Sequence, residues 1–251
     1  MLHDKDIREP LFDFLDETSD EVLYQSTSLD AKAYAKIRII EEKTMGKSRA
    51  DVVMVTEDAL YGIEVKSDVD TYARLASQVK DYDKYYDFNY VVVGTSHALH
   101  IKEHVPEHWG VITVEIVDDE FDFYILRRPE PNPKVTWKRK LEILWRPELA
   151  KLQDWNQMPK YKEKSKAFVK DKIVERLEAG KIDEAQLRHQ VSELLLERDY
   201  NNVGEQLAEF KKGEIAKKLE KENAPERQIE LMAQRAQVKK NFKKPGRRRR
   251  R

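Results

Sequence analysis

Short apolar runs alternate with helical periods along the first half of the chain. Runs rich in β-branched and aromatic residues, which are typical of strands, occupy residues 37–42, 51–56, 60–66, 90–94, 111–117 and 121–127. Apolar residues at helical spacing predict helices over residues 7–15 and 69–86. The order helix, three strands, helix, strand predicts an α/β fold with a central mixed sheet flanked by helices.

The helix predicted over residues 69–86 has one apolar face that suits packing on the sheet. Its apolar positions follow helical spacing at Leu75, Val79, Tyr82 and Tyr86. Asp68 or Asp70 can accept hydrogen bonds from the first free amides of such a helix. The strand that follows, residues 90–94, is apolar throughout, which predicts burial on both of its faces.

After about Pro147 the strand signals stop and charged helical periods take over. These periods predict helices over residues 167–178, 182–199, 203–221 and 226–238. One of them carries an apolar seam suited to a partner helix, formed by Leu187, Val191, Leu194 and Leu195. We therefore expect a core over residues 1–130, a charged helical extension over residues 131–234 and a disordered basic tail over residues 235–251. Through these helices the chain could form a homo-oligomer or bind a partner protein, and the sequence does not choose between the two.

Composition narrows the classes of protein that this chain can be. Its 251 residues contain no cysteine, which excludes a disulfide scaffold, a thiolate zinc site and a cysteine nucleophile. No apolar run approaches the roughly 18 residues of a membrane span, and the first ten residues are too charged for a secretory signal. We expect a cytoplasmic protein that does not bind a membrane.

A formal net charge of zero hides an uneven distribution. Residues 1–150 carry 20 basic and 30 acidic side chains, whereas residues 235–251 carry ten Lys and Arg and no acid. Such a run repels itself in water and predicts a disordered arm that contacts the phosphates of a nucleic acid. The contacts are expected from Lys243, Lys244, Arg247, Arg248, Arg249, Arg250 and Arg251. A solubilising tail is the alternative.

Two carboxylates and an ammonium are expected to converge at one edge of the sheet. Asp51 opens the second predicted strand, a turn follows that strand, and Glu64 and Lys66 close the third. Residues two apart in a strand point to the same side, so Glu64 and Lys66 share a face. Carboxylate oxygens suit Mg²⁺ or Mn²⁺, and a nearby amine can hold an attacking water. The alternative is an exposed sheet face held by salt bridges.

These residues resemble the PD-(D/E)xK nuclease superfamily. The resemblance rests on Asp51, the hairpin, Glu64-x-Lys66 and the Q-x-x-x-Y element formed by Gln78 and Tyr82. The sequence segments RADVVMV, YGIEVKSDVDT and RLASQVKDYDKYYD are most similar to a small family of bacterial and phage proteins in that superfamily. The resemblance covers about residues 5–117. It implies a restriction-endonuclease-like core, here followed by a helical C-terminal extension.

The resemblance also implies roles for particular residues. Asp51, Glu64 and the Val65 carbonyl would bind Mg²⁺ or Mn²⁺, and Lys66 would position the water. Gln78 and Tyr82 would support the site or contact substrate.

Four further positions complete the comparison with the motif. Ala50 replaces the proline that gives the motif its name. The additional upstream acid of the family is expected at Glu42, with Glu9 as second choice. Arg74 lies one turn before Gln78 and is expected to contact nucleic acid.

Other chemistry in the sequence is weaker. His97, His100, His104 and His108 cluster, but Pro106 interrupts the helical spacing of the last two, so surface histidines are favoured over a zinc site.

Taken together, the features predict a Mg²⁺-dependent nuclease that cleaves DNA, with RNA left open as substrate. The alternatives are a catalytically silent nuclease-fold protein that binds nucleic acid or a protein partner, and an arginine-rich RNA-binding or assembly factor.

Overall fold

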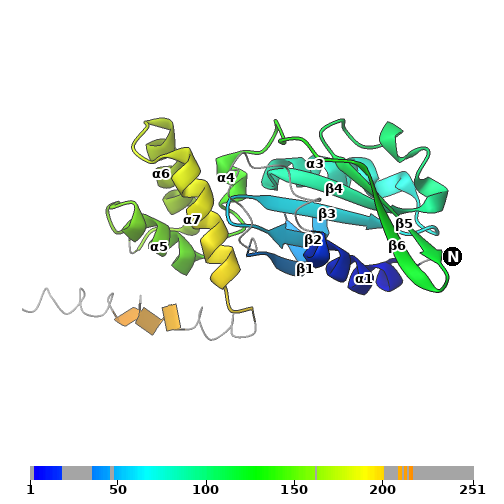
Figure 1. Cartoon of the computed structure of the whole chain (residues 1–251). Helices are drawn as coiled ribbons and strands as arrows, with labels where there is room; N and C mark the ends of the chain where they lie inside the picture. The colour runs from blue at the N-terminus through cyan, green and yellow to red at the C-terminus, as the bar shows by residue number, and fades with distance from the viewer. Residues whose placement is uncertain are drawn as a thin grey trace, which may run out of the picture. The chain divides into compact units, whose positions relative to one another are not determined.

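A six-stranded mixed sheet lies at the centre of the fold (Figure 1). Its strands follow the chain order from one edge to the other: β1 (Arg38–Met45), β2 (Ser48–Val55), β3 (Leu60–Lys66), β4 (Phe88–Gly94), β5 (Gly110–Val117) and β6 (Glu120–Arg127). β3, β4 and β5 run parallel, whereas the pairs β1–β2, β2–β3 and β5–β6 are antiparallel. The predicted α/β class with a mixed sheet is confirmed, and all six predicted strands are present.

The computed structural model describes residues 3–18, 36–45, 48–161, 163–200, 209–210, 212–213 and 215–216. It divides the chain into two compact units, Met1–Arg198 and Asp199–Arg251, and the sheet belongs to the first. The helices predicted over 203–221 and 226–238 lie outside the described residues, except for the helical residues among 209–216. The basic tail, 235–251, also lies outside them. In the described part of the chain, no helix is long and apolar enough to cross a membrane.

Alternation along the strands builds two separate apolar clusters, one on each side of the sheet. In β4, Val91 and Val93 enter one cluster, while Tyr90 and Val92 enter the other. All four side chains are fully buried, as the sequence predicted for this strand. Helix α1 (Asp4–Glu17) contributes to the second cluster, and α3 (Leu75–Tyr85) to the first. The sheet is thus flanked by a helix on each side (Figure 1).

Helix α3 begins later than the sequence predicts. The chain first forms a turn and a short 3₁₀ helix, η1 (Tyr72–Arg74), and the two predicted capping aspartates bind other groups instead. Asp70 accepts hydrogen bonds from the Ser67 amide at 2.9 Å and from its hydroxyl at 2.7 Å, and Asp68 accepts one from the Ser96 hydroxyl at 2.6 Å. Aspartate bonds of this kind compete with helix formation. Two more 3₁₀ turns, η2 (Thr95–His97) and η3 (Ile101–Glu103), follow β4.

Four helices after the sheet complete the first unit: α4 (Trp137–Lys140), α5 (Arg146–Trp155), α6 (Lys166–Glu178) and α7 (Glu184–Glu197). The sequence predicted α6 and α7 but not α4 or α5. Their apolar side chains join the cluster that lies between α3 and the sheet. The first compact unit therefore extends to Arg198, whereas the sequence placed a boundary near residue 130.

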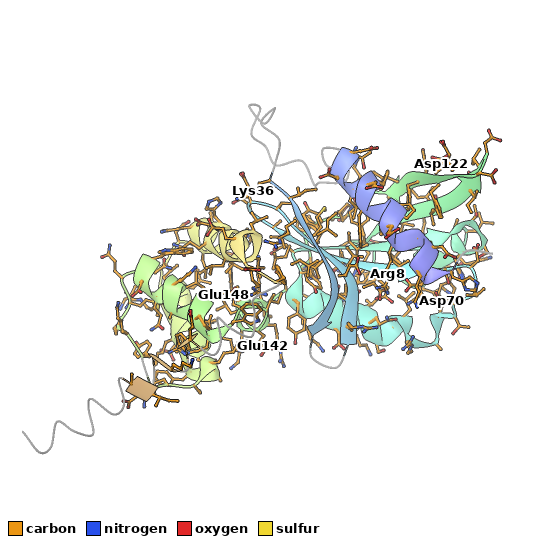
Figure 2. The ribbon with its side chains drawn as sticks, turned by 90° about the horizontal axis from the view of Figure 1, so that it is seen from below. Arg8, Lys36, Asp70, Asp122, Glu142 and Glu148 are labelled. Atoms are coloured by element: carbon orange, nitrogen blue, oxygen red, sulfur yellow. The ribbon has the colours of Figure 1, made fainter. Side chains whose placement is uncertain are left out.

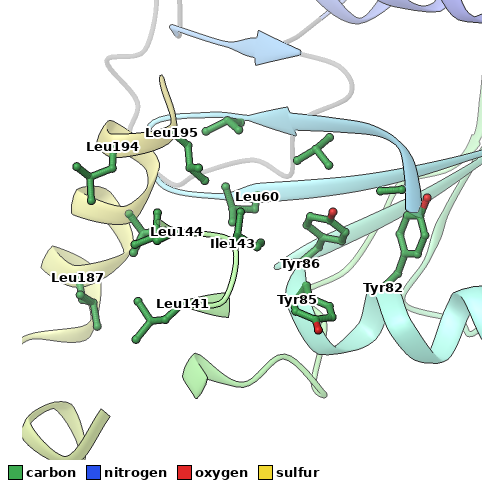
Figure 3. Packing of buried hydrophobic residues seen from close by; sticks show 14 of the residues in the cluster. Leu60, Tyr82, Tyr85, Tyr86, Leu141, Ile143, Leu144, Leu187, Leu194 and Leu195 are labelled. Atoms are coloured by element: carbon green, nitrogen blue, oxygen red, sulfur yellow. The ribbon is translucent and has the colours of Figure 1, made fainter. Parts of the chain in front are cut away.

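The apolar seam of α7 finds its partner within this unit. Leu187, Val191, Leu194 and Leu195 are all at most 2% exposed. Figure 3 shows leucines of α7 opposite Leu141 and Leu144, with Leu60 of β3 close by. The seam that the sequence offered to a partner helix is thus filled by the chain itself.

Candidate active site

The site begins where strands β2 and β3 separate. Their antiparallel ladder runs as far as the pair Val52 and Ile63. Beyond that pair the Asp51 carboxylate replaces the backbone partner, because its Oδ2 accepts a hydrogen bond from the Val65 amide at 3.0 Å. A strand residue presents its N–H and C=O groups to the same side, so the Val65 carbonyl faces the side of Asp51. Asp51 therefore lies in the fork between the two strands.

Glu64 lies next to this fork and is completely buried. Its Oε1 accepts hydrogen bonds from the Lys66 ammonium and the Gln78 amide, and its Oε2 accepts one from the Tyr82 hydroxyl at 2.7 Å. Lys66 itself is only 6% exposed. The alternative of an exposed salt-bridged face is therefore wrong for this pair. A buried carboxylate with an ammonium and two neutral donors is held in one position.

Tyr82 connects both carboxylate residues to α3. Its hydroxyl accepts a hydrogen bond from the Asp51 amide at 3.1 Å and donates one to Glu64. The ring is fully buried, and burial and then Glu64 raise the pKa of the Tyr82 hydroxyl well above its usual range. The hydroxyl consequently remains a donor at neutral pH. Four residues earlier on the same helical face, Gln78 contacts the same carboxylate.

Burial and the neighbouring Glu64 both act on the charge of Asp51. Burial raises the pKa of Asp51 to about 7, and the neighbouring Glu64 carboxylate adds to this rise. The Val65 amide and the Lys66 ammonium act in the opposite direction but do not cancel it. A negative charge on Asp51 is therefore costly in this environment, and a cation placed close to both acids would stabilise it.

Helix α1 contributes two residues that the sequence analysis missed. The Arg8 guanidinium contacts Asp51 Oδ1 at 3.3 Å and Asp4 Oδ2 at 2.7 Å. Figure 2 shows the place of Arg8 on α1. Asp4 and Arg8 are four residues apart on α1, and this spacing was the signal that could have identified them as neighbours. The contact of Arg8 with Asp51 spans 43 residues of sequence, and no local pattern reports such a contact.

The predicted upstream acids have different positions. Glu9, the second choice, is an exposed residue of α1. Glu42, the first choice, belongs to β1, and the register pairs its neighbours Glu41 with Val52 and Lys43 with Ala50. The Glu42 side chain lies outside the described residues. The acid that α1 brings to the site is Asp4.

The predicted nucleic-acid contact Arg74 is exposed at the end of η1, directly before α3. It does not share the buried environment of Gln78 and Tyr82. The predicted contacts Lys243, Lys244 and 247–251 lie outside the described residues. Their part in binding stays a prediction.

The donors at the fork fit a hard divalent cation. Among the described residues, no group of three or more His, Cys, Asp or Glu side chains suits a metal ion. The fork instead offers two carboxylates and a backbone carbonyl, and Mg²⁺ is commonly held by one or two carboxylates together with water. Gln78 Oε1 is in addition buried without a hydrogen-bond partner. A neutral oxygen left in this state suits a cation or its water shell.

The histidines near the site make other contacts. Tyr72 stacks on His104 with a distance of 4.0 Å between ring centroids, and His97 lies against the same tyrosine. His108 contacts the buried Asp83 carboxylate at 3.0 Å. His97 and His108 are half-buried, whereas the sequence predicted surface histidines, and His104 is exposed.

Comparison with known proteins gives two matches. SfsA from Pyrococcus furiosus, solved in complex with Ca²⁺, has 15% sequence identity and a TM-score of 0.29 over 52% of this chain. The match spans about two thirds, 65%, of the SfsA chain, and a TM-score this low does not establish a shared fold. No curated protein matches the chain. The family described as bacteriophage P4 protein cII matches residues 21–222. A match over most of the sequence shows that this chain belongs to the bacteriophage P4 protein cII family.

Proposed function

We propose that this protein is a metal-dependent nuclease that hydrolyses phosphodiester bonds of DNA. Its sheet and helices would be a restriction-endonuclease-like core, with a PD-(D/E)xK-type site at the fork of β2 and β3. One observation carries the proposal: the buried Glu64 carboxylate lies beside Asp51 at a strand fork, with the Lys66 ammonium in contact with it. The phage family is in keeping with an enzyme that acts on DNA in the host cytoplasm.

Asp51, Glu64 and the Val65 carbonyl would hold the cation. Mg²⁺ and Mn²⁺ both suit this all-oxygen set. When bound, the cation would supply positive charge against the charge that develops on the phosphate during hydrolysis. The raised pKa of Asp51 supports a cation here, because burial and then the nearby Glu64 carboxylate disfavour the negative charge of Asp51, and a cation would favour it.

Lys66 would position the attacking water. An ammonium has three N–H donors, and one of them is used in the contact with Glu64. The other two can donate to a water molecule or to a phosphate oxygen. Because Lys66 is buried and held by Glu64, its ammonium would be fixed before substrate arrives.

Gln78 and Tyr82 would orient Glu64. Each donates to a different oxygen of that carboxylate, which prevents rotation about its last bond. Tyr82 also accepts a hydrogen bond from the Asp51 amide, so it would fix the distance between the two acids. Arg74 and the basic residues of the tail would contact phosphates outside the site, giving salt-sensitive binding with little sequence preference.

A second candidate is a nuclease-fold protein that binds nucleic acid without cutting it. The observation that favours it is that Lys66, Gln78 and Tyr82 already engage both oxygens of Glu64. A carboxylate that is satisfied in this way needs no metal to be stable. The two candidates predict the same binding but differ in turnover.

The deciding experiment measures cleavage by purified protein. Linear, nicked and single-stranded DNA, and RNA, are incubated with Mg²⁺, Mn²⁺ or EDTA. Wild-type protein should cleave DNA only with metal, and Glu64→Gln should lower the rate by about 10³-fold. Glu115→Gln, which changes an exposed acid of β5, is the matched control and should cleave like wild type.

The contrary outcomes are distinct. Equal cleavage by wild-type protein and Glu64→Gln would assign the activity to a contaminant or to another site. Binding of DNA with no metal-dependent cleavage would favour the silent nuclease-fold protein.

A further inference from the structure

The Arg8 guanidinium contacts Asp51, which is also a ligand of the proposed metal site. We propose that Arg8 is the resident counter-cation of Asp51, and that a divalent cation must displace it before the site can work. This inference rests on the proposed function. It assigns to α1 a regulatory part in metal loading, carried by the ion pairs of Arg8 with Asp4 and Asp51.

The geometry directs Arg8 at the carboxylate oxygen that a metal would use. Asp51 Oδ2 is occupied by the Val65 amide, and the Arg8 guanidinium contacts the other oxygen, Oδ1. The Arg8 side chain is 14% exposed and that of Asp51 is 16% exposed, so little water screens the pair. A guanidinium in this position occupies the oxygen of the proposed ligand that the Val65 amide does not use.

Electrostatic repulsion disfavours binding of a divalent cation while the Arg8 guanidinium contacts Asp51. A divalent ion between Asp51 and Glu64 would lie close to the Arg8 guanidinium, and Lys66 already supplies a second positive charge on Glu64. A divalent and a monovalent cation a few ångströms apart repel each other, and the repulsion is stronger where little water screens it. Metal binding is therefore weakened unless Arg8 moves away from Asp51.

Asp4 can remain the ion-pair partner of Arg8 when Arg8 leaves Asp51. The contact with Asp4, at 2.7 Å, is shorter than the contact with Asp51, at 3.3 Å, so the longer of the two would break. Asp4 Oδ1 is buried without a hydrogen-bond partner. By turning toward Asp4, the planar guanidinium could use both oxygens of this carboxylate, which is its preferred geometry. Arg8 would then leave Asp51 without becoming an unpaired buried charge.

The test measures Mn²⁺ affinity by isothermal titration calorimetry, without nucleic acid. Arg8→Met keeps most of the apolar stem and removes the charge, and we expect it to tighten Mn²⁺ binding by about tenfold. Arg8→Lys keeps the charge and should stay within about threefold of wild type. Lys5→Met removes an exposed charge from the same helix and should leave the affinity unchanged. Circular dichroism identifies any variant that fails to fold, and Arg8→Gln then replaces Arg8→Met with the same expectation.

The outcomes separate this inference from the proposed function. Unchanged or weaker Mn²⁺ binding in folded Arg8→Met and Arg8→Gln would overturn the part of Arg8, provided that wild type binds and Glu64→Gln does not. An equal gain in Lys5→Met would also overturn it, because the effect would then reflect the general charge of α1. No Mn²⁺ binding by any variant would overturn both the inference and the metal-dependent function.

Discussion

The two ends of β3 each meet a buried carboxylate, and the difference between them separates a structural from a functional use of charge. At its first residue, Leu60, the strand faces Asp87. At its other end it carries Glu64 and Lys66, beside Asp51. Both regions combine acids and bases in the same protein core. They differ in how completely the acids are satisfied.

At the first end every oxygen of the acid has a strong donor. Asp87 Oδ2 accepts from the Leu60 amide at 2.9 Å and from the Lys140 ammonium at 2.6 Å, and Oδ1 accepts from Arg188 at 2.7 Å. Burial lowers the pKa of Lys140, while Asp87 acts to raise it again. This arrangement fixes α4 and α7 to the start of β3. Both Asp87 oxygens already accept hydrogen bonds from protein donors.

At the fork the compensation is incomplete. The pKa of Asp51 is raised to about 7, and Gln78 Oε1 is buried without a partner. The arrangement around Asp87, with a donor on every oxygen, stabilises the fold better than the arrangement at the fork. Arg8 and Lys66 each contact one of the two acids, yet the pKa of Asp51 stays raised, and under the proposed function a divalent cation from solution would lower it.

The largest expected effect follows from making the same change at both ends. Asp87→Asn should lower the free energy of unfolding by about 3–5 kcal/mol, because the buried Lys140 loses its carboxylate. Asp51→Asn should cost less than about 1 kcal/mol without metal, because burial already disfavours its charge and Arg8 keeps Asp4 as a partner. Urea unfolding in EDTA measures both. Equal losses would remove the distinction between the two ends.

A metal should stabilise only one of the two regions. At 100 times the dissociation constant, Mn²⁺ should raise the free energy of unfolding of wild-type protein by about 2.7 kcal/mol. Glu64→Gln should lose this gain, whereas Asp87→Asn should keep it despite its lower starting stability. Melting curves with and without Mn²⁺ decide the matter. Stabilisation that survives Glu64→Gln would place the cation elsewhere.

Sequence patterns predicted what depends on local periodicity. The alternation of apolar residues predicted all six strands, and with the Q-x-x-x-Y spacing it brought Glu64, Gln78 and Tyr82 to one place. Alternation reports the face of a strand but not its depth. For that reason Glu64 was expected at a surface cation site, whereas it is fully buried beneath α3.

The contacts that the sequence could not supply are those between distant segments. Asp4 and Arg8 reach the site because Ile7, Leu11 and Leu15 pack α1 against the sheet, and no motif records the direction of the polar face that results. Helices α4 and α5 were missed because they are short, and α5 has a proline in its first turn. Long-range packing of the same kind brings residues 131–198 into one compact unit with the sheet.

The smallest expected effect compares two tyrosines of one helix. Tyr82 and Tyr85 both lie on α3 (Figure 3). Tyr82 contacts Glu64 at the fork, whereas Tyr85 donates to Glu142 at 3.1 Å. Tyr82→Phe removes the acceptor of the Asp51 amide and a donor to Glu64. It should cost about 1–2 kcal/mol in stability and slow cleavage by about tenfold at saturating metal.

Tyr85→Phe is the matched control, since it removes the same hydroxyl from the same helix. Its partner Glu142 keeps Lys170 at 2.9 Å and also Arg139, so we expect a stability loss below about 1 kcal/mol and no change in cleavage rate. Initial rates normalised to the folded fraction measure the contrast. If both variants lost rate equally, α3 would act on the site through its overall packing. If neither did, the hydroxyl of Tyr82 would be structural, and the difference between the two ends of β3 would not extend to the helix that covers them.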